Sequence, residues 1–230
     1  MEIKKAIVLY IFLLLYNNLI NLLPADFHAK IYVGFNFLLL IFLLYYSAKF
    51  LNLNFLEIGY ESKYFFNSLI FGFLFSLIVL LPFLFLLILL PKLGVVIKPP
   101  LIMIDSQSEF FYKLFIRIPL GTALFEENLF RGILYAYLIK KNSIKKTFII
   151  TSIFFTIWHI MPVLKVVSSN FQMRLSLVGM VMWLAGIIGA FIAGLFFAIL
   201  RYKGKSIVGC IISHALINDL TLIIIIYLWR

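Results

Sequence analysis

The residues best suited to chemistry lie in the stretch 125–132, where Glu126, Glu127 and Arg131 interrupt an otherwise apolar run. An ionisable side chain in a membrane-spanning helix costs roughly 2.5–3.5 kcal/mol on insertion scales, so such residues usually pair with one another or form a functional site. Because helical residues i and i+4 share a face, Glu127 is expected to meet Arg131. Glu126 points to a different face, where this segment offers no charge partner. We therefore predict that Glu127 and Arg131 form a structural ion pair and that Glu126 is free for chemistry.

Three more polar residues occur at a similar depth in two later apolar stretches. His159 lies in the first of them, and His214 and Asn218 lie in the second with i, i+4 spacing. At 1.5 Å per residue, the distance to the end of the helix expected on the cytoplasmic side is about 20 Å for Glu126 and about 12–18 Å for the other three. Three separate helices thus carry polar groups at one level, which indicates a shared polar cavity.

A carboxylate, two imidazoles and a carboxamide around one water can hydrolyse an amide bond. Glu126 could take a proton from the water and later pass it to the leaving amine, while His159 orients the water. His214 and Asn218 would donate hydrogen bonds to the oxyanion that forms on the scissile carbonyl, typically the largest electrostatic contribution. These four residue types predict a hydrolytic site for peptide bonds.

Two other site chemistries fit some of these residues. Glu126, His159 and His214 could form a three-ligand zinc site with an open fourth position. The chain has no H-E-x-x-H pair, however, and the carboxamide of Asn218 is a poor zinc ligand, so metal-independent water activation is favoured. Cys210 and His214 have the i, i+4 spacing of a Cys–His nucleophile pair, but no Asn or Asp is clearly placed to orient that histidine. The favoured interpretation therefore requires no cofactor, and Zn2+ is the alternative.

The elements that must position these residues are membrane-spanning helices. Of the 230 residues, 64% are hydrophobic, against about 45–50% in soluble domains. The sequence predicts an all-α, polytopic transmembrane helical bundle with a polar intramembrane cavity. Pro82 predicts a kink, residues 52–63 are expected to lie along the surface, and residues 91–109 are expected to form a loop. The expected spans, about seven runs of about 20 residues, are 6–23, 31–50, 64–90, 110–139, 147–164, 175–200 and 206–229.

Basic residues predict the orientation of this bundle. The net charge is +11, but Lys and Arg lie mostly in short connections between apolar runs, so topology and anionic lipids explain them better than nucleic acid does. With the N-terminus inside, eleven of them fall on the cytoplasmic side and six on the other. Residues 6–23 are too long for the apolar part of a signal peptide and no small-residue cleavage site follows, so we expect a retained first span. The chain is therefore expected to be a multi-pass protein of the cell membrane with a cytoplasmic N-terminus.

Three motifs occur in order on three apolar helices: E-E-x-x-F-R-G at residues 126–132, F-x-x-x-H at 155–159 and H-x-x-x-N at 214–218. Together they resemble the CPBP family of intramembrane proteases, named for CAAX prenyl protease and bacteriocin processing and also called Abi. Each motif alone is weak, but three in this order with compatible spacing are specific. The resemblance covers roughly residues 110–229, and the first three spans match only in general character.

The resemblance implies an α-helical membrane endopeptidase whose polar cavity opens toward the cytosolic leaflet. Eukaryotic members of the family cut the last three residues from prenylated proteins, and many bacterial members are tied to bacteriocin maturation or self-immunity. By this resemblance Glu126 is the water-activating glutamate and His159 its partner. His214 and Asn218 match the pair that stabilises the oxyanion.

The remaining motif positions are Glu127 and Arg131, to which the spacing argument gives the structural role. The family is commonly labelled metalloprotease, which keeps the zinc alternative open. We expect one integral membrane domain, in which residues 1–109 hold the N-terminal helices and loops and residues 110–230 form the CPBP-like catalytic core.

The expected function is intramembrane endopeptidase activity on membrane-associated, prenylated or bacteriocin-like peptides. The expected partners are a peptide or lipidated-protein substrate and membrane lipids, without nucleic acid. The alternative is a non-enzymatic membrane protein, either an immunity factor or a proton-coupled transporter with Glu126 and the histidines as its relay. Neither needs His214 and Asn218 as a hydrogen-bonding pair at the depth of Glu126, which favours the protease.

Overall fold

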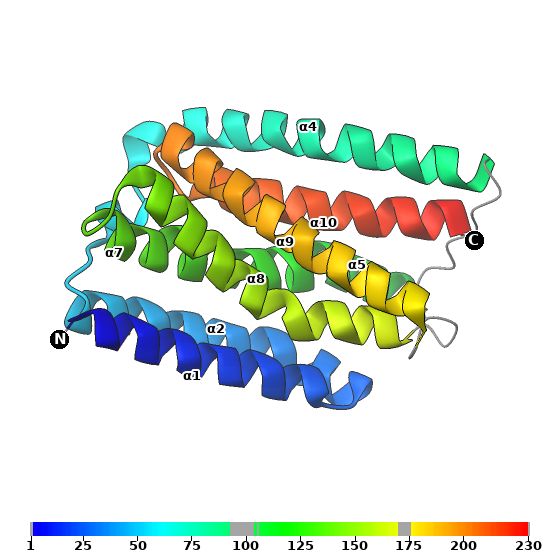
Figure 1. Ribbon diagram of the computed structural model, residues 1–230, viewed down its shortest axis with the longest axis horizontal. Coiled ribbons are helices and arrows are strands. Elements are labelled where there is room, and N and C mark those ends of the chain that lie inside the picture. The colour runs from blue at the N-terminus through cyan, green and yellow to red at the C-terminus, as the bar shows by residue number, and fades with distance from the viewer. Residues whose placement is uncertain (1, 93–103, 105, 170–175, 230) are drawn as a thin grey trace.

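The chain folds into a bundle of long helices. The computed structural model describes residues 2–92, 104, 106–169 and 176–229, and Figure 1 shows their helices extending along a common direction. Within these residues there is no strand, so the predicted all-α class is confirmed. The long helices are α1 (Glu2–Leu22), α2 (Ala25–Phe50), α4 (Phe65–Lys92), α8 (Ile144–Ser169), α9 (Leu177–Gly204) and α10 (Val208–Trp229), together with a segmented helix over residues 107–139.

Most of these helices have the length and composition of membrane spans. In the described part of the chain, α1, α2, α4, α8 and α9 contain such segments, and α10 contains a shorter apolar segment, Val208–Ile224. The segmented helix is not among them, since charged residues occur along it. The chain is thus an α-helical membrane bundle, and each predicted apolar run coincides with a helix.

Helix ends differ from the predictions in the first half of the chain. α2 begins at Ala25, earlier than predicted, because Pro24 fits the position before the first turn and Asp26 is favourable near a helix N-terminus. α4 runs through Pro82 and ends at Lys92, two residues beyond the predicted span 64–90. The predicted loop 91–109 falls mostly outside the described residues.

The connection between α2 and α4 closes one end of the bundle. It contains α3 (Phe55–Ile58) and the 3₁₀ turn η1 (Ser62–Tyr64). α3 begins with a capping box, in which the side chains of Asn54 and Glu57 each accept a hydrogen bond from the other's backbone N–H. It ends at Gly59, whose φ of 110° is readily adopted only by glycine. Leu51, Leu53 and Ile58 are buried, so three apolar side chains anchor this connection in the bundle.

The segmented helix lies at the centre of the bundle. It runs without a break through α5 (Gln107–Tyr112), the π-helical η2 (Lys113–Ala123), α6 (Leu124–Glu127), the π-helical η3 (Asn128–Leu134) and α7 (Tyr135–Ile139). Residues 125–138 are all buried, and α2, α8, α9 and α10 contact this helix. Pro119 within η2 lacks the N–H of a helical hydrogen bond, and π turns are frequent at functional sites. Both glutamates of the first motif therefore lie on one α-helical turn between two π-helical segments.

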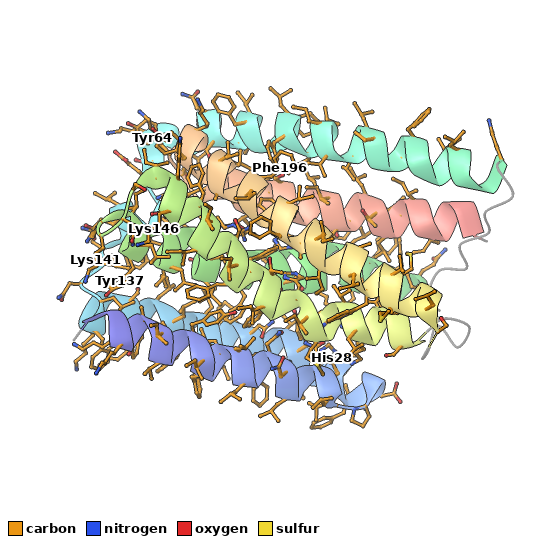
Figure 2. All side chains as sticks on the ribbon, viewed as in Figure 1. His28, Tyr64, Tyr137, Lys141, Lys146 and Phe196 are labelled. Atoms are coloured by element: carbon orange, nitrogen blue, oxygen red, sulfur yellow. The ribbon has the colours of Figure 1, made fainter. Side chains whose placement is uncertain are left out.

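Basic connections gather at one end of the bundle because the long helices alternate in direction. α1, α4, α8 and α10 all start at the left end of Figure 1, and Figure 2 shows Lys141 and Lys146 at that end and His28 toward the other. At the same end, Lys140 Nζ lies 2.6 Å from Glu57 Oε1. The basic segments assigned to the cytoplasm thus share one end, and the side of the membrane that this end faces stays a prediction.

One of these basic residues does not face headgroups. Arg201 is buried, and its guanidinium lies 5.3 Å from the ring centre of Tyr135. Its Nε donates to the carbonyl of Arg131 at 3.2 Å, and its Nη2 donates to the carbonyl of Glu57 at 3.1 Å. This arginine therefore ties α9 to η3 and α3.

Candidate active site

Glu126 lies between two aromatic side chains of α8. Its Oε1 accepts a hydrogen bond from Trp158 Nε1 at 3.1 Å, and its Oε2 lies 3.8 Å from His159 Nε2. The carboxylate is buried, and Oε2 has no hydrogen-bond partner among the described residues. The structure thus brings together Glu126 and His159, the two residues expected to activate water.

The tautomer of His159 follows from its other contact. Its Nδ1 lies 2.8 Å from the carbonyl oxygen of Phe155. A carbonyl can only accept, so Nδ1 carries the proton, and the neutral imidazole has its lone pair on Nε2. The ring centre of Phe155 lies 4.2 Å away and fixes the imidazole further. The acceptor nitrogen of His159 therefore faces the unpartnered oxygen of Glu126.

Glu127 meets Arg131, as the i, i+4 spacing predicts, but it also has a second partner. Arg131 Nη1 donates to Glu127 Oε1 at 3.2 Å, and His214 Nδ1 donates to the same oxygen at 2.7 Å. His214 thus adds a contact to Glu127 from another helix, while it also lines a cavity together with His159. Spacing along one helix cannot show which side chain a neighbouring helix supplies.

Arg131 is buried in an aromatic box. Its side chain is 1% exposed, and its guanidinium carbon lies 4.2 Å from the ring centre of Phe155 and 4.9 Å from that of Phe197. Its Nη2 donates to the carbonyl of Gly194 at 3.3 Å. Cation–π contacts of desolvated arginines are worth about 2 kcal/mol or more, so α8 and α9 help to hold this charge inside the bundle.

His159, His214 and Asn218 line one cavity of about 350 Å3. The rest of its wall is apolar and comes from α4, α8, α9 and α10. Phe196, labelled in Figure 2, packs at 5.6 Å against Phe75 on α4, and both line this cavity. Glu126 does not line the cavity, so His159 is the residue that connects its carboxylate to this space.

Two observations bear on the alternative site chemistries. Among the residues that the structure describes, no group of three or more His, Cys, Asp or Glu side chains is placed to hold a metal ion. The thiol of Cys210 donates to the carbonyl of Phe197 at 3.6 Å, while His214 turns Nδ1 to Glu127.

Asp219 follows Asn218 directly on α10 but is not among the residues that line the cavity. Its Oδ1 is buried without a hydrogen-bond partner in the described part of the chain.

Trp158 is a site residue that the three sequence motifs do not include. Its side chain is buried, and its ring packs at 5.7 Å from Phe130 and at 6.0 Å from Phe125. Its indole N–H nevertheless reaches Glu126. The available signal was chemical, because a buried tryptophan N–H usually finds an acceptor.

Comparison with known proteins gives one match. Residues 108–220 match the family described as Type II CAAX prenyl endopeptidase Rce1-like. The match spans the three motifs and confirms their resemblance to the CPBP family. No curated protein and no solved structure matches the chain. α1, α2 and α4 lie outside the matched segment.

Proposed function

We propose, on the premise that residues 108–220 belong to the CPBP family of intramembrane proteases, that this chain is a CAAX-type endopeptidase that cleaves peptides with water activated by Glu126 and His159. The family match supports this activity in general. The observation that carries the mechanism is the 3.8 Å approach of Glu126 Oε2 to His159 Nε2 inside an apolar bundle. Burial of a carboxylate at such a depth is characteristic of functional sites.

The two facing atoms are suited to hold one water. An ionised carboxylate oxygen and a lone-pair nitrogen are both acceptors, so they cannot bond to each other, whereas a water between them donates one hydrogen to each. Its oxygen then keeps lone pairs for attack on the scissile carbonyl carbon. Glu126 takes the proton as the new C–O bond forms and delivers it to the amine nitrogen as the C–N bond breaks. The products are a carboxylic acid and an amine.

His214 and Asn218 are placed to stabilise the oxyanion. His214 uses Nδ1–H for Glu127 at 2.7 Å, so a doubly protonated ring keeps Nε2–H for the cavity, and the Glu127 carboxylate offsets its charge. Asn218, one helical turn later on α10, offers its side-chain N–H to the same cavity. Preorganised donors of this kind act where charge develops during the reaction.

The substrate class follows from the cavity wall. Apart from its three polar residues the cavity is apolar, which suits a prenyl chain or a large aliphatic side chain next to the scissile bond. We therefore propose lipidated or membrane-embedded peptides as substrates, bacteriocin-like peptides being of the same chemical class. Membrane lipids are the other proposed partners, and the mechanism needs no metal ion.

The decisive experiment compares two carboxylate-to-amide changes in purified protein in liposomes, with a fluorogenic prenylated peptide as substrate. Glu126→Gln keeps the size of the side chain but removes the base, so hydrolysis should fall by roughly 10²–10⁴-fold. Asp219→Asn alters another intramembrane carboxylate outside the site and should retain wild-type activity.

Undiminished hydrolysis by Glu126→Gln would contradict the mechanism. A wild-type protein that carries pH-dependent ion flux without hydrolysis would instead be a transporter. An immunity factor that acts by binding would keep its phenotype when both Glu126 and His159 are replaced.

A further inference from the structure

The two carboxylate oxygens of Glu126 have different environments, because only one of them accepts a hydrogen bond from Trp158. The indole N–H of Trp158 occupies Oε1, while Oε2 is left for His159. A hydrogen bond to an ionised acceptor contributes roughly twice as much as a neutral one and fixes its direction. The orientation of the carboxylate therefore depends on where α8 holds the indole.

α8 is weakened at that point by a proline. Pro162 lies inside α8, and a helical proline cannot donate to the carbonyl four residues earlier, which here belongs to Trp158. The side chain of Asn17 on α1 replaces the missing donor, with Nδ2 2.8 Å from the Trp158 carbonyl oxygen. One heptad earlier on α1, the hydroxyl of Tyr10 donates to the carbonyl of Phe154 at 2.7 Å. Two hydrogen bonds thus hold α8 against α1 on the side of Trp158.

α2 makes a similar contact with the helix that carries Glu126. Asn36 Nδ2 donates to the carbonyl of Gly121 in η2 at 2.7 Å, and Asn36 Oδ1 accepts from the hydroxyl of Tyr16 on α1 at 2.6 Å. Asn17 and Asn36 are only 5% and 2% exposed, so their amide groups bond within the protein and not to solvent. α1 therefore supports the helix that carries Trp158, and α2 supports the helix that carries Glu126. Both supporting helices lie outside the segment that matches the family.

We propose that Trp158 is a positioning residue for Glu126 and that Asn17 on α1 holds Trp158 in place. The inference rests on the proposed peptidase function. The indole fixes Oε1, so that Oε2 meets the water shared with His159. The two N-terminal helices are then part of the catalytic apparatus, although they contribute no group that touches substrate.

The test replaces the indole by a phenyl ring, which keeps the packing and removes the N–H. In Trp158→Phe, kcat should fall by roughly ten- to a hundredfold, with KM within about twofold. The pH–rate profile should change as well, which a loss of packing alone would not produce. The other titratable groups near Glu126 are His159 on α8, His214 on α10 and Tyr32 on α2, and they are unaltered by this change.

The matched control is Trp183→Phe. Trp183 on α9 also donates its indole N–H, but to a backbone carbonyl, that of Ile160 at 3.4 Å. The Trp183→Phe variant should therefore have the kcat and the pH–rate profile of the wild type. An equal loss in both variants, or a Trp158→Phe enzyme with wild-type kcat, overturns the proposal.

The second variant, Asn17→Leu, keeps the indole and removes its support. It should lower kcat in the same direction by a smaller factor and add nothing further in the Trp158→Phe background. If Trp158→Phe does not fold, wild-type kcat and pH profile in Asn17→Leu overturn the proposal.

A direct readout does not depend on cleavage. The chain has three tryptophans, so the 15N-labelled protein in detergent should give three indole N–H signals. The signal of Trp158 should shift with pH and stop doing so in Glu126→Gln, while that of Trp183 should not respond. A wild-type protein with this behaviour but without hydrolysis would refute the proposed function and leave the contact standing, whereas an unresponsive Trp158 signal refutes the inference alone.

Discussion

Glu127 Oε1 receives hydrogen bonds from two helices, from His214 on α10 and from Arg131 on its own helix. Removing one partner of a buried ion pair typically costs about 3–5 kcal/mol, because the other charge stays buried. Glu127→Gln should therefore lower the melting temperature in detergent, and it should also lower hydrolysis, because His214 loses its carboxylate. Glu126→Gln is the control and should melt near the wild-type temperature, as its carboxylate pairs with no Arg or Lys among the residues that the structure describes. A Glu127→Gln protein as stable as wild type would show that Arg131 finds another partner.

In the proposed mechanism, Asn218 donates a hydrogen bond to the oxyanion. Asn218→Leu keeps the size of the side chain and removes the N–H donor, so kcat should fall by roughly 10²–10³-fold while KM changes little. Ile217→Leu changes the same cavity wall without touching a donor, and it should behave as wild type. Steady-state kinetics on one peptide compares the two, and a loss confined to KM would place Asn218 in substrate binding.

Single residues also show where sequence reasoning stops. The i, i+4 rule found the contact of Glu127 with Arg131, because both lie on one helix and its geometry is fixed. The contacts of Trp158 with Glu126 and of His214 with Glu127 join different helices. They depend on how each helix is rotated in the bundle, which a helix that is apolar on all sides does not reveal.

At the scale of the element, the glycines of α9 have different surroundings. A Cβ on Gly186 would lie 2.6 Å from Val163, and one on Gly194 would lie 2.9 Å from the Ser152 backbone, so both allow α8 to approach closely. A Cβ on Gly189 would meet nothing within 4 Å, and Gly189 lines the cavity. Small residues in a membrane helix usually mark close helix packing, which holds for Gly186 and Gly194 but not for Gly189.

Filling the cavity from Gly189 should change substrate preference. Gly189→Leu should lower kcat/KM by roughly tenfold or more for a peptide whose large apolar group enters the cavity. It should leave kcat/KM unchanged for a peptide with alanine at that position, because the substitution removes space and alters no catalytic group. A Cβ on Gly34 of α2 likewise meets nothing within 4 Å, but Gly34 is not in the cavity, so Gly34→Leu is the control. Equal losses for both peptides would place the bound group elsewhere.

The apolar runs predicted the long helices because about 20 uninterrupted apolar residues permit few other structures in a membrane. The π-helical winding of η2 and η3 was not predicted. No composition rule marks it, and α2, α8, α9 and α10 pack around this helix. The winding nonetheless decides which faces of the helix present Glu126 and Glu127.

At the scale of the whole molecule, the grouping of basic connections at one end predicts a cytoplasmic location for that end. The only natural cysteine, Cys210, is fully buried, so a thiol reagent should not label the wild-type protein. A membrane-impermeant maleimide added to intact cells should label Asp26→Cys and not Lys141→Cys, and inverted vesicles should show the reverse. The opposite pattern would mean that the N-terminus faces outward.

The central helix has a consequence for biogenesis. Glu127 and Arg131 pair within this helix, but the further partners of its glutamates and arginine lie on α8, α9 and α10, which are synthesised after it. Residues 107–139 are not among the segments that are apolar enough to span a membrane by composition alone. Insertion machinery that selects each segment by its own hydrophobicity is therefore not expected to insert this helix by itself. This segment therefore has to wait at the bilayer boundary until its later neighbours arrive, so assembly of the catalytic centre and completion of membrane insertion become a single event late in translation.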